Sequence, residues 1–132
     1  MNEQAEVLVL DDEEVVCERL KSHLEKSNFK VETFSESQAA INRLGEKDFD
    51  VVVTDLKMKG PTGLDVLQFV QSRVGRTQVI LITGYASIEA SREAEYRGVY
   101  RFIEKPFRLE DIGRLVKKAA KEGKKLKERA GA

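Results

Sequence analysis

The stretch that decides the fold is 51-VVVTDLKMKGPTG-63, in which an unbroken β-branched run leads directly into an aspartate. Residues 51–54 show no alternation of apolar and polar side chains, which is typical of a strand covered on both faces in a parallel sheet. Asp55 follows at the carboxyl end, and Gly60 and Gly63 serve as turn and helix-entry residues before the next helical pattern. The stretch predicts a central strand with a carboxylate at its tip.

Four other segments have the pattern of strands. They are 7-VLVL-10, 30-KVETF-34, 79-VILIT-83 and 100-YRFIE-104. The segment 30–34 alternates and predicts a short edge strand, whereas the segments 7–10 and 79–83 are mainly continuous apolar runs.

Polar side chains stand at the downstream ends of these strands. Asp11 and Asp12 follow the first strand, Asp55 follows the third, Thr83 ends the fourth, and Lys105 follows the fifth. The carboxyl ends of parallel strands lie at one edge of a sheet, where ligands bind in open α/β folds. We therefore expect these five residues to converge.

Helical periodicity fills the intervals between the strands. The first predicted helix has Val16, Leu20 and Leu24 on one face, and the second has an N-cap at Ser35 and a stop at Gly45. The third presents Leu64, Leu67, Val70 and Val74, and the fourth starts at Ser87 and ends near Gly98. The last repeats apolar residues at Ile112, Leu115, Val116, Ala119 and Ala120. The fourth helix has the poorest apolar face, because Arg92 and Glu95 stand where a buried stripe would need hydrocarbon. Strands that alternate with helices predict an α/β fold with one parallel sheet.

The composition bounds the class of protein. A chain of 132 residues, 41% of them hydrophobic, suits a single domain with a core. Lys plus Arg equals Asp plus Glu at 23 each, so the net charge gives no reason to expect direct nucleic-acid binding. The single cysteine excludes an internal disulfide, the residues after Met1 resemble no signal peptide, and the apolar runs are too short to span a bilayer. We expect a soluble cytoplasmic domain.

Three carboxylates at one edge of a sheet repel one another. Two unit charges about 4 Å apart cost roughly 4 kcal/mol at an effective dielectric near 20. Protonation, a cation or Lys105 must relieve this repulsion. Mg²⁺ suits an all-oxygen site and typically binds one or two carboxylates, water and phosphate oxygens. The cluster therefore predicts a Mg²⁺ site that would also neutralise an incoming phosphoryl group.

Asp55 is the best candidate for a phosphoryl acceptor, because it ends the most central-looking strand and an ionised carboxylate can form an acyl phosphate. Lys105 can bind a phosphoryl oxygen as a point charge, and Thr83 can donate a hydrogen bond to another. Any one of these residues alone fits an ordinary polar loop end. Five suitable residues on four strand ends favour a site.

Four segments, taken together, resemble the response-regulator receiver domains of two-component signalling. They are VLVLDDE, VVVTDLKMKGPTGLDVL, VILITGYAS and FIEKPF, which span residues 7–107. The resemblance implies a doubly wound five-stranded parallel sheet in the flavodoxin-like order 2-1-3-4-5, with helices on both faces. It also implies a phosphoacceptor with at most slow self-dephosphorylation, not an enzyme that turns over a substrate.

The resemblance assigns a role to each residue of the cluster. Asp55 would accept a phosphoryl group from the phosphohistidine of a sensor histidine kinase or a phosphotransfer protein. The ligands of Mg²⁺ would be Asp11, Asp12, Asp55 and the backbone carbonyl of Lys57. The phosphoryl group would be contacted by Thr83, the backbone N–H of Gly84, and Lys105.

A switch is implied as well. On phosphorylation Thr83 would move toward the phosphoryl group and Phe102 would turn inward behind it, which would alter the face formed by the fourth helix, the fifth strand and the last helix. That face would bind an output partner or form a homodimer. The segment 102-FIEKPFRLEDI-112 is most similar to receivers of DNA-binding transcription activators, which implies control of transcription.

The chain departs from the family pattern at several positions. Lys59 stands where the family usually has proline, and Arg92 and Glu95 replace residues that are usually apolar. Lys57 and Tyr85 occupy positions that influence loss of the phosphoryl group in the family. We hypothesise that their bulk shields the acyl phosphate from water.

Two further points stay open. Residues 1–122 would form the receiver domain, and the basic segment 123–132 would be a solvated helix extension or the start of a linker, in preference to a nucleic-acid patch because it lacks aromatic residues. Competing functions are a phosphorylation-independent interaction domain and a phosphatase of the haloacid dehalogenase type. The latter needs a second aspartate where Lys57 stands.

Overall fold

The computed structural model describes residues 4–73, 75–84, 92, 95 and 97–131. Its strands are β1 (Glu6–Leu10), β2 (Lys30–Phe34), β3 (Val51–Asp55), β4 (Gln78–Thr83) and β5 (Arg101–Glu104). Its helices are α1 (Glu14–Lys26), α2 (Ser37–Glu46), α3 (Gly63–Ser72) and α5 (Leu109–Gly131). Each predicted strand is present, with bounds that differ from the expected ones by one residue at most.

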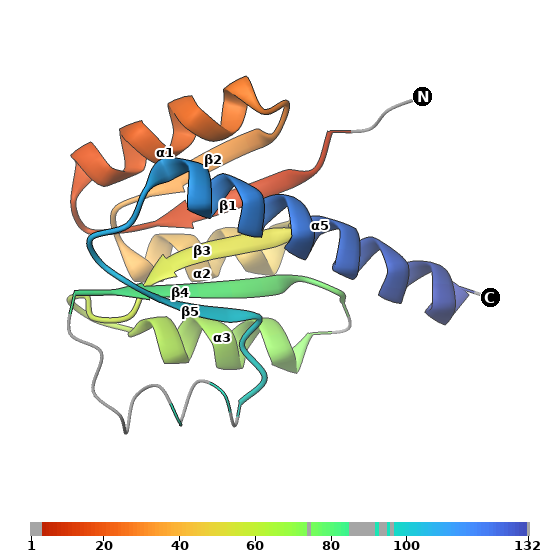
Figure 1. Ribbon diagram of the computed structural model, residues 1–132. Helices are drawn as coiled ribbons and strands as arrows, with labels where there is room; N and C mark the ends of the chain where they lie inside the picture. The colour runs from red at the N-terminus through yellow and green to blue at the C-terminus, as the bar shows by residue number, and fades with distance from the viewer. Residues whose placement is uncertain (1–3, 74, 85–91, 93–94, 96, 132) are drawn as a thin grey trace.

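The strands form one five-stranded parallel sheet in the order β2-β1-β3-β4-β5 (Figure 1). The register places Val7 of β1 opposite Val51 of β3, and Val51 opposite Gln78 of β4. Neighbouring strands thus start and end almost level, and their carboxyl ends form one edge. The predicted fold class and strand order are confirmed.

Helices cover both faces of the sheet, as predicted (Figure 1). Residues of α1 and α5 pack on one face against Val51 and Val53, and residues of α2 and α3 pack on the other face against Val52. Successive residues of β3 point to opposite faces, and both faces are buried. This double burial explains why the strand is apolar throughout.

One helix start differs from expectation, and another has a cap that was not predicted. The prediction that Ser35 caps the second helix is wrong, because α2 begins at Ser37 after Glu36, which makes no side-chain cap hydrogen bond. In α3, Thr62 forms a capping box with Asp65, a device the sequence analysis did not identify.

The predicted fourth helix lies mostly outside the described residues, and so does its proposed cap, Ser87. Arg92 and Glu95 are helical and exposed. Neither side chain therefore belongs to a buried stripe. Gly98 follows with a φ of 86°, a left-handed conformation that favours glycine.

The last helix, α5, runs without interruption to Gly131, and its C-terminal turns extend past the sheet (Figure 1). Gly123 is buried within it, and a Cβ there would stand 2.7 Å from the carbonyl oxygen of Arg76. Arg76 Nε donates to the carbonyl of Leu126 at 3.4 Å. The basic segment therefore continues the helix, while the domain boundary at residue 122 stays a prediction. Within the described part of the chain, no helix combines the length and apolarity needed to cross a membrane.

Candidate functional site

The sheet fixes the backbone at each end of the predicted site. The N–H of Asp11 donates to Phe34 of β2 at 3.1 Å, and the N–H of Lys105 donates to Thr83 of β4 at 2.7 Å. Asp55 ends β3, which lies between β1 and β4. Residues far apart in the sequence are thus held at one edge by hydrogen bonds that continue the strand pairing.

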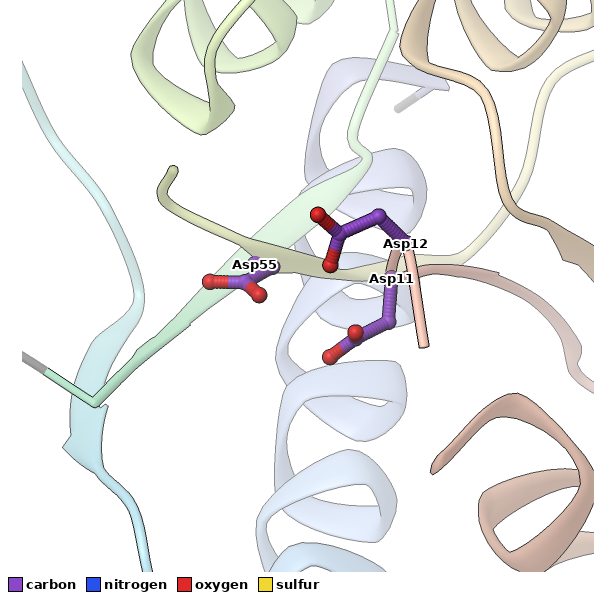
Figure 2. Close-up of side chains that lie close together, drawn as sticks. All are labelled: Asp11, Asp12 and Asp55. Atoms are coloured by element: carbon purple, nitrogen blue, oxygen red, sulfur yellow. The ribbon is translucent and has the colours of Figure 1, made fainter. Parts of the chain in front are cut away.

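Three carboxylates converge at this edge. Asp11, Asp12 and Asp55 each offer an oxygen, and these oxygens lie within 4.8 Å of one another (Figure 2). Asp11 is 2% exposed and Asp55 is 7% exposed, whereas Asp12 is exposed. The predicted convergence of the acidic residues is confirmed.

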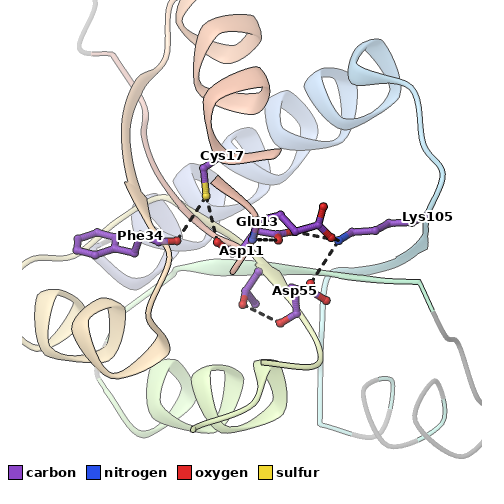
Figure 3. Close-up of polar contacts among 7 residues, drawn as sticks. Asp11, Glu13, Cys17, Phe34, Asp55 and Lys105 are labelled. Atoms are coloured by element: carbon purple, nitrogen blue, oxygen red, sulfur yellow. Dashed lines mark hydrogen bonds and ion pairs between the residues drawn. The ribbon is translucent and has the colours of Figure 1, made fainter. Parts of the chain in front are cut away.

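Lys105 lies among these carboxylates. Its Nζ is 3.1 Å from Asp11 Oδ2 and 3.3 Å from Asp55 Oδ2 (Figure 3). A third carboxylate, Glu13, lies 3.8 Å away, and its backbone N–H donates to Asp11 Oδ1 at 2.9 Å. The sequence analysis missed Glu13, although its place directly after the two aspartates was a usable signal.

The pKa values of the ion pair reflect burial and charge together. Burial raises the pKa of Asp11, and this outweighs the opposing effects of the Glu13 N–H and of Lys105. Burial alone would lower the pKa of Lys105, but its hydrogen bonds and charge interactions with Asp11 and Asp55 raise it overall. Lys105 therefore stays protonated at neutral pH and offsets part of the negative charge.

The structure also describes four other predicted site residues outside the acidic pocket, which is formed by Asp11, Asp12 and Asp55. Thr83 is buried at the end of β4, one residue beyond Ile82, which pairs with Asp55. Gly84 is exposed, and a Cβ there would meet nothing within 4 Å. Phe102 is partly buried against the face of the sheet that α2 and α3 cover. Their roles, and that of the exposed Lys57, stay predictions, and Tyr85 lies outside the described residues.

The donor set of the acidic pocket fits a hard divalent cation. It consists of carboxylate oxygens from two adjacent strand ends, and Lys105 supplies one positive charge against the three negative ones. Mg²⁺ prefers oxygen ligands, typically carboxylates together with water and phosphate oxygens. The residues present therefore agree with the predicted metal.

Cys17 and Thr54 make buried hydrogen bonds to the backbone of the aspartates, and Figure 3 shows those of Cys17. Cys17 Sγ donates to the carbonyl of Asp11 at 3.3 Å and to that of Phe34 at 3.5 Å, and burial raises the pKa of its thiol. Thr54 Oγ1 donates to the carbonyl of Asp55 at 3.0 Å. The prediction that Cys17 is a small core residue is confirmed.

Comparison with known proteins agrees with this geometry. An NtrX-like response regulator of Rickettsia typhi is 33% identical over 118 residues, which cover 88% of this chain and 25% of that protein. The regulatory protein AtoC of Escherichia coli is 30% identical over 113 residues, which cover 86% and 24%. The chain thus spans about a quarter of the length of these relatives.

Solved structures show the same fold. A response regulator receiver domain protein from Clostridium thermocellum matches with a TM-score of 0.86 and 29% identity, covering 92% of this chain and 98% of that one. The beryllofluoride-activated NtrC4 receiver domain dimer matches with a TM-score of 0.82 and 32% identity, covering 89% and 97%.

The family pattern itself extends over most of the described sheet and helices. The response regulator receiver domain matches residues 7–117, from the start of β1 into α5, and this range includes all three carboxylates and Lys105. Such domains accept a phosphoryl group and do not turn over a substrate. The chain belongs to the response-regulator receiver-domain family.

Proposed function

We propose that this domain accepts a phosphoryl group on Asp55 from the phosphohistidine of a sensor histidine kinase or a phosphotransfer protein. The observation that carries the proposal is the pairing of Lys105 with both Asp11 and Asp55 at the carboxyl edge of the sheet. This arrangement sets a nucleophilic carboxylate beside a fixed positive charge. Family membership supports the histidine kinase as partner.

The transfer exchanges one bond to phosphorus for another. An Asp55 carboxylate oxygen attacks the phosphorus, the P–N bond to the donor imidazole breaks, and the imidazole nitrogen keeps the electron pair and takes up a proton. Lys105 holds its ammonium proton and stabilises the negative charge of the phosphoryl oxygens. Thr83 Oγ1 and the N–H of Gly84 are the proposed donors to those oxygens.

Asp11, Asp12, Asp55 and the Lys57 carbonyl are the proposed ligands of Mg²⁺. When bound, the ion supplies charge neutralisation for the carboxylates and the incoming phosphoryl group. Asp11 is buried and has an oxygen bound to the N–H of Glu13, so its carboxylate is oriented before any cation arrives. Asp12 is exposed and provides the solvent side of the site.

The proposed output is a change at β5 and α5, together with the segment that precedes β5. Leu81 of β4 pairs with Phe102 of β5, so the strand that ends in Thr83 lies directly beside the strand of the proposed switch aromatic. We propose that this face binds an output partner or a second copy of the domain and thereby regulates transcription. The relatives named as regulatory proteins, and the neighbour solved as a receiver dimer, support this assignment.

Incubation with acetyl phosphate and Mg²⁺, followed by intact-mass measurement, tests the proposal. The wild-type protein should gain the mass of one phosphoryl group, and Asp55→Asn should gain none. Asp50→Asn is a matched control, because Asp50 directly precedes the amino end of the same strand and accepts a hydrogen bond from the N–H of Glu6. No gain in the wild type, or an equal gain in Asp55→Asn, would refute the proposal.

The competing functions have less support. The phosphorylation-independent interaction domain rested on the charged residues of the fourth helix, and Arg92 and Glu95 prove to be exposed. Exposed charges at these two positions carry no desolvation penalty, so they do not favour this alternative. A phosphatase of the haloacid dehalogenase type would need an acid at Lys57.

A further inference from the structure

Ser37 is a buried polar residue outside the acidic pocket. It is 2% exposed and is the first residue of α2, and its Oγ donates to the carbonyl of Lys59 at 3.1 Å. A serine at a helix start usually serves its own helix as an N-cap. Here the N-cap is Glu36, without a side-chain cap bond, so the hydroxyl of Ser37 serves the loop between β3 and α3.

The β3–α3 loop, residues 56–62, is held from two sides. At its base the N–H of Gly63 donates to the carbonyl of Leu56 at 2.8 Å. On its far side Lys59 accepts the hydrogen bond of Ser37, and Gly60, at a φ of 77°, lies so close that a Cβ there would stand 3.4 Å from Ser37 Oγ. The loop is thus a ring that is closed at its base and tied to α2 at its far side.

This ring carries the proposed fourth ligand of the metal. Only Lys57 and Met58 lie between the anchored residues Leu56 and Lys59, and Met58 packs in the same core cluster as Ala40 of α2. Each residue has two soft backbone dihedrals, so two anchored neighbours leave the Lys57 carbonyl few orientations. The Ser37 hydrogen bond restricts the loop in advance, so the Lys57 carbonyl loses less conformational freedom when a cation binds.

We infer that Ser37 is a positioning residue for the metal site, which acts by holding the β3–α3 loop so that the Lys57 carbonyl is available to a cation bound by the acidic pocket. The inference rests on the proposed function in one respect, the role of Lys57 as a ligand of Mg²⁺. Ser37 itself contacts neither the cation nor the phosphoryl group.

Titration of the full chain with Mg²⁺ alone, followed by amide NMR shifts, measures the dissociation constant without any phosphodonor. Ser37→Ala should raise that constant about fivefold, the factor that corresponds to a hydrogen bond worth roughly 1 kcal/mol. Ser37→Thr keeps the hydroxyl and should bind Mg²⁺ as the wild type does. Ser22→Ala removes an exposed serine from α1 and should change nothing.

Equal Mg²⁺ affinity in the wild type and in Ser37→Ala would overturn the inference, and would do so even if the variant were less stable to urea, because the hydroxyl would then be purely structural. If Ser37→Ala fails to fold, hydrogen exchange in the wild type decides. Mg²⁺ should slow exchange of the amides of residues 57–60 and of Thr62, and unchanged exchange would also overturn the inference. A wild type that binds Mg²⁺ but gains no phosphoryl group on Asp55 would refute the proposed function alone.

Discussion

Removal of the Asp12 charge tests the electrostatics of the acidic pocket without breaking a described ion pair. Lys105 pairs with Asp11, Asp55 and Glu13, whereas Asp12 contributes mainly repulsion toward the other two carboxylates of the pocket. Asp12→Asn keeps the size and the polar character of the side chain. We therefore expect the metal-free variant to be more stable than the metal-free wild type.

The expected gain follows from the separations. At the 4.8 Å limit between the carboxylate oxygens, one pair of charges costs about 0.9 kcal/mol in water and about 3.5 kcal/mol at an effective dielectric near 20. Asp12 is exposed, so the lower value applies to its two pairs. The attraction of Asp12 to Lys105 offsets the repulsion of about one of these pairs. Removal of the Asp12 charge should therefore raise the free energy of unfolding by about 1 kcal/mol. With a urea slope of about 2 kcal/mol per molar, the unfolding midpoint should rise by about 0.5 M.

Urea unfolding at low salt, in the presence of a chelator, measures this gain. Asp48→Asn is a suitable control, because Asp48 is an exposed aspartate that pairs with a cation, Arg73, at 3.6 Å. Loss of this exposed ion pair should change stability by about 0.5 kcal/mol or less. Saturating Mg²⁺ should reverse the order of wild type and Asp12→Asn, since the wild type binds the cation more tightly. An Asp12→Asn variant that is no more stable than the wild type without metal would refute the reasoning.

Three other substitutions probe the same edge of the sheet. Gly63→Ala should destabilise the domain by about 2 kcal/mol or more in urea unfolding, because the new Cβ would stand 2.5 Å from the carbonyl oxygen of Asp55; unchanged stability would contradict the tight packing of α3. Burial raises the pKa of Asp11 above 3.8, so the folded state binds this proton more tightly than the unfolded chain. Asp11→Asn should therefore stabilise the metal-free domain at neutral pH, by an amount that shrinks as the pH falls through the folded pKa toward 3.8; a gain that does not vary with pH would contradict this. Lys57→Ala should speed phosphate release from the phosphorylated domain several-fold, and an equal rate would remove the shielding hypothesis.

The strands and the acidic pocket were predictable because burial and chemistry act on the same short segments. A central parallel strand must be apolar on both faces, so 51–54 could be recognised without knowledge of its neighbours. The acidic residue that follows each apolar run then lies at the carboxyl edge of the sheet, although Asp11 and Asp55 are themselves buried there. The convergence of Asp11, Asp55 and Lys105 followed from the parallel arrangement alone, although they lie up to 94 residues apart.

The loop contacts were not predictable in the same way. Ser35 and Ser37 are both acceptable at a helix start by local preference. Ser37 instead donates to the carbonyl of Lys59, a residue that only the fold brings to α2. Local reasoning had a signal for α3, since Thr62 and Asp65 have the spacing of a capping box. Side chains that act across the fold leave no comparable pattern in the sequence.

In the proposed chemistry, phosphorylation changes the geometry of the pocket more than its charge. Asp55 exchanges one negative charge for a phosphoryl group of about −1.5 to −2, so the net change is at most about one unit. Lys105 Nζ already lies 3.3 Å from Asp55 and neutralises part of the negative charge before the phosphoryl group is transferred. The new oxygens, however, need hydrogen-bond donors, and Thr83 is the hydroxyl at the adjacent strand end. Because Leu81 of the same strand pairs with Phe102, a displacement of Thr83 would be transmitted to β5 through the backbone of the sheet. The position of a hydroxyl, and not a change in total charge, is therefore the quantity on which signalling by this domain should depend.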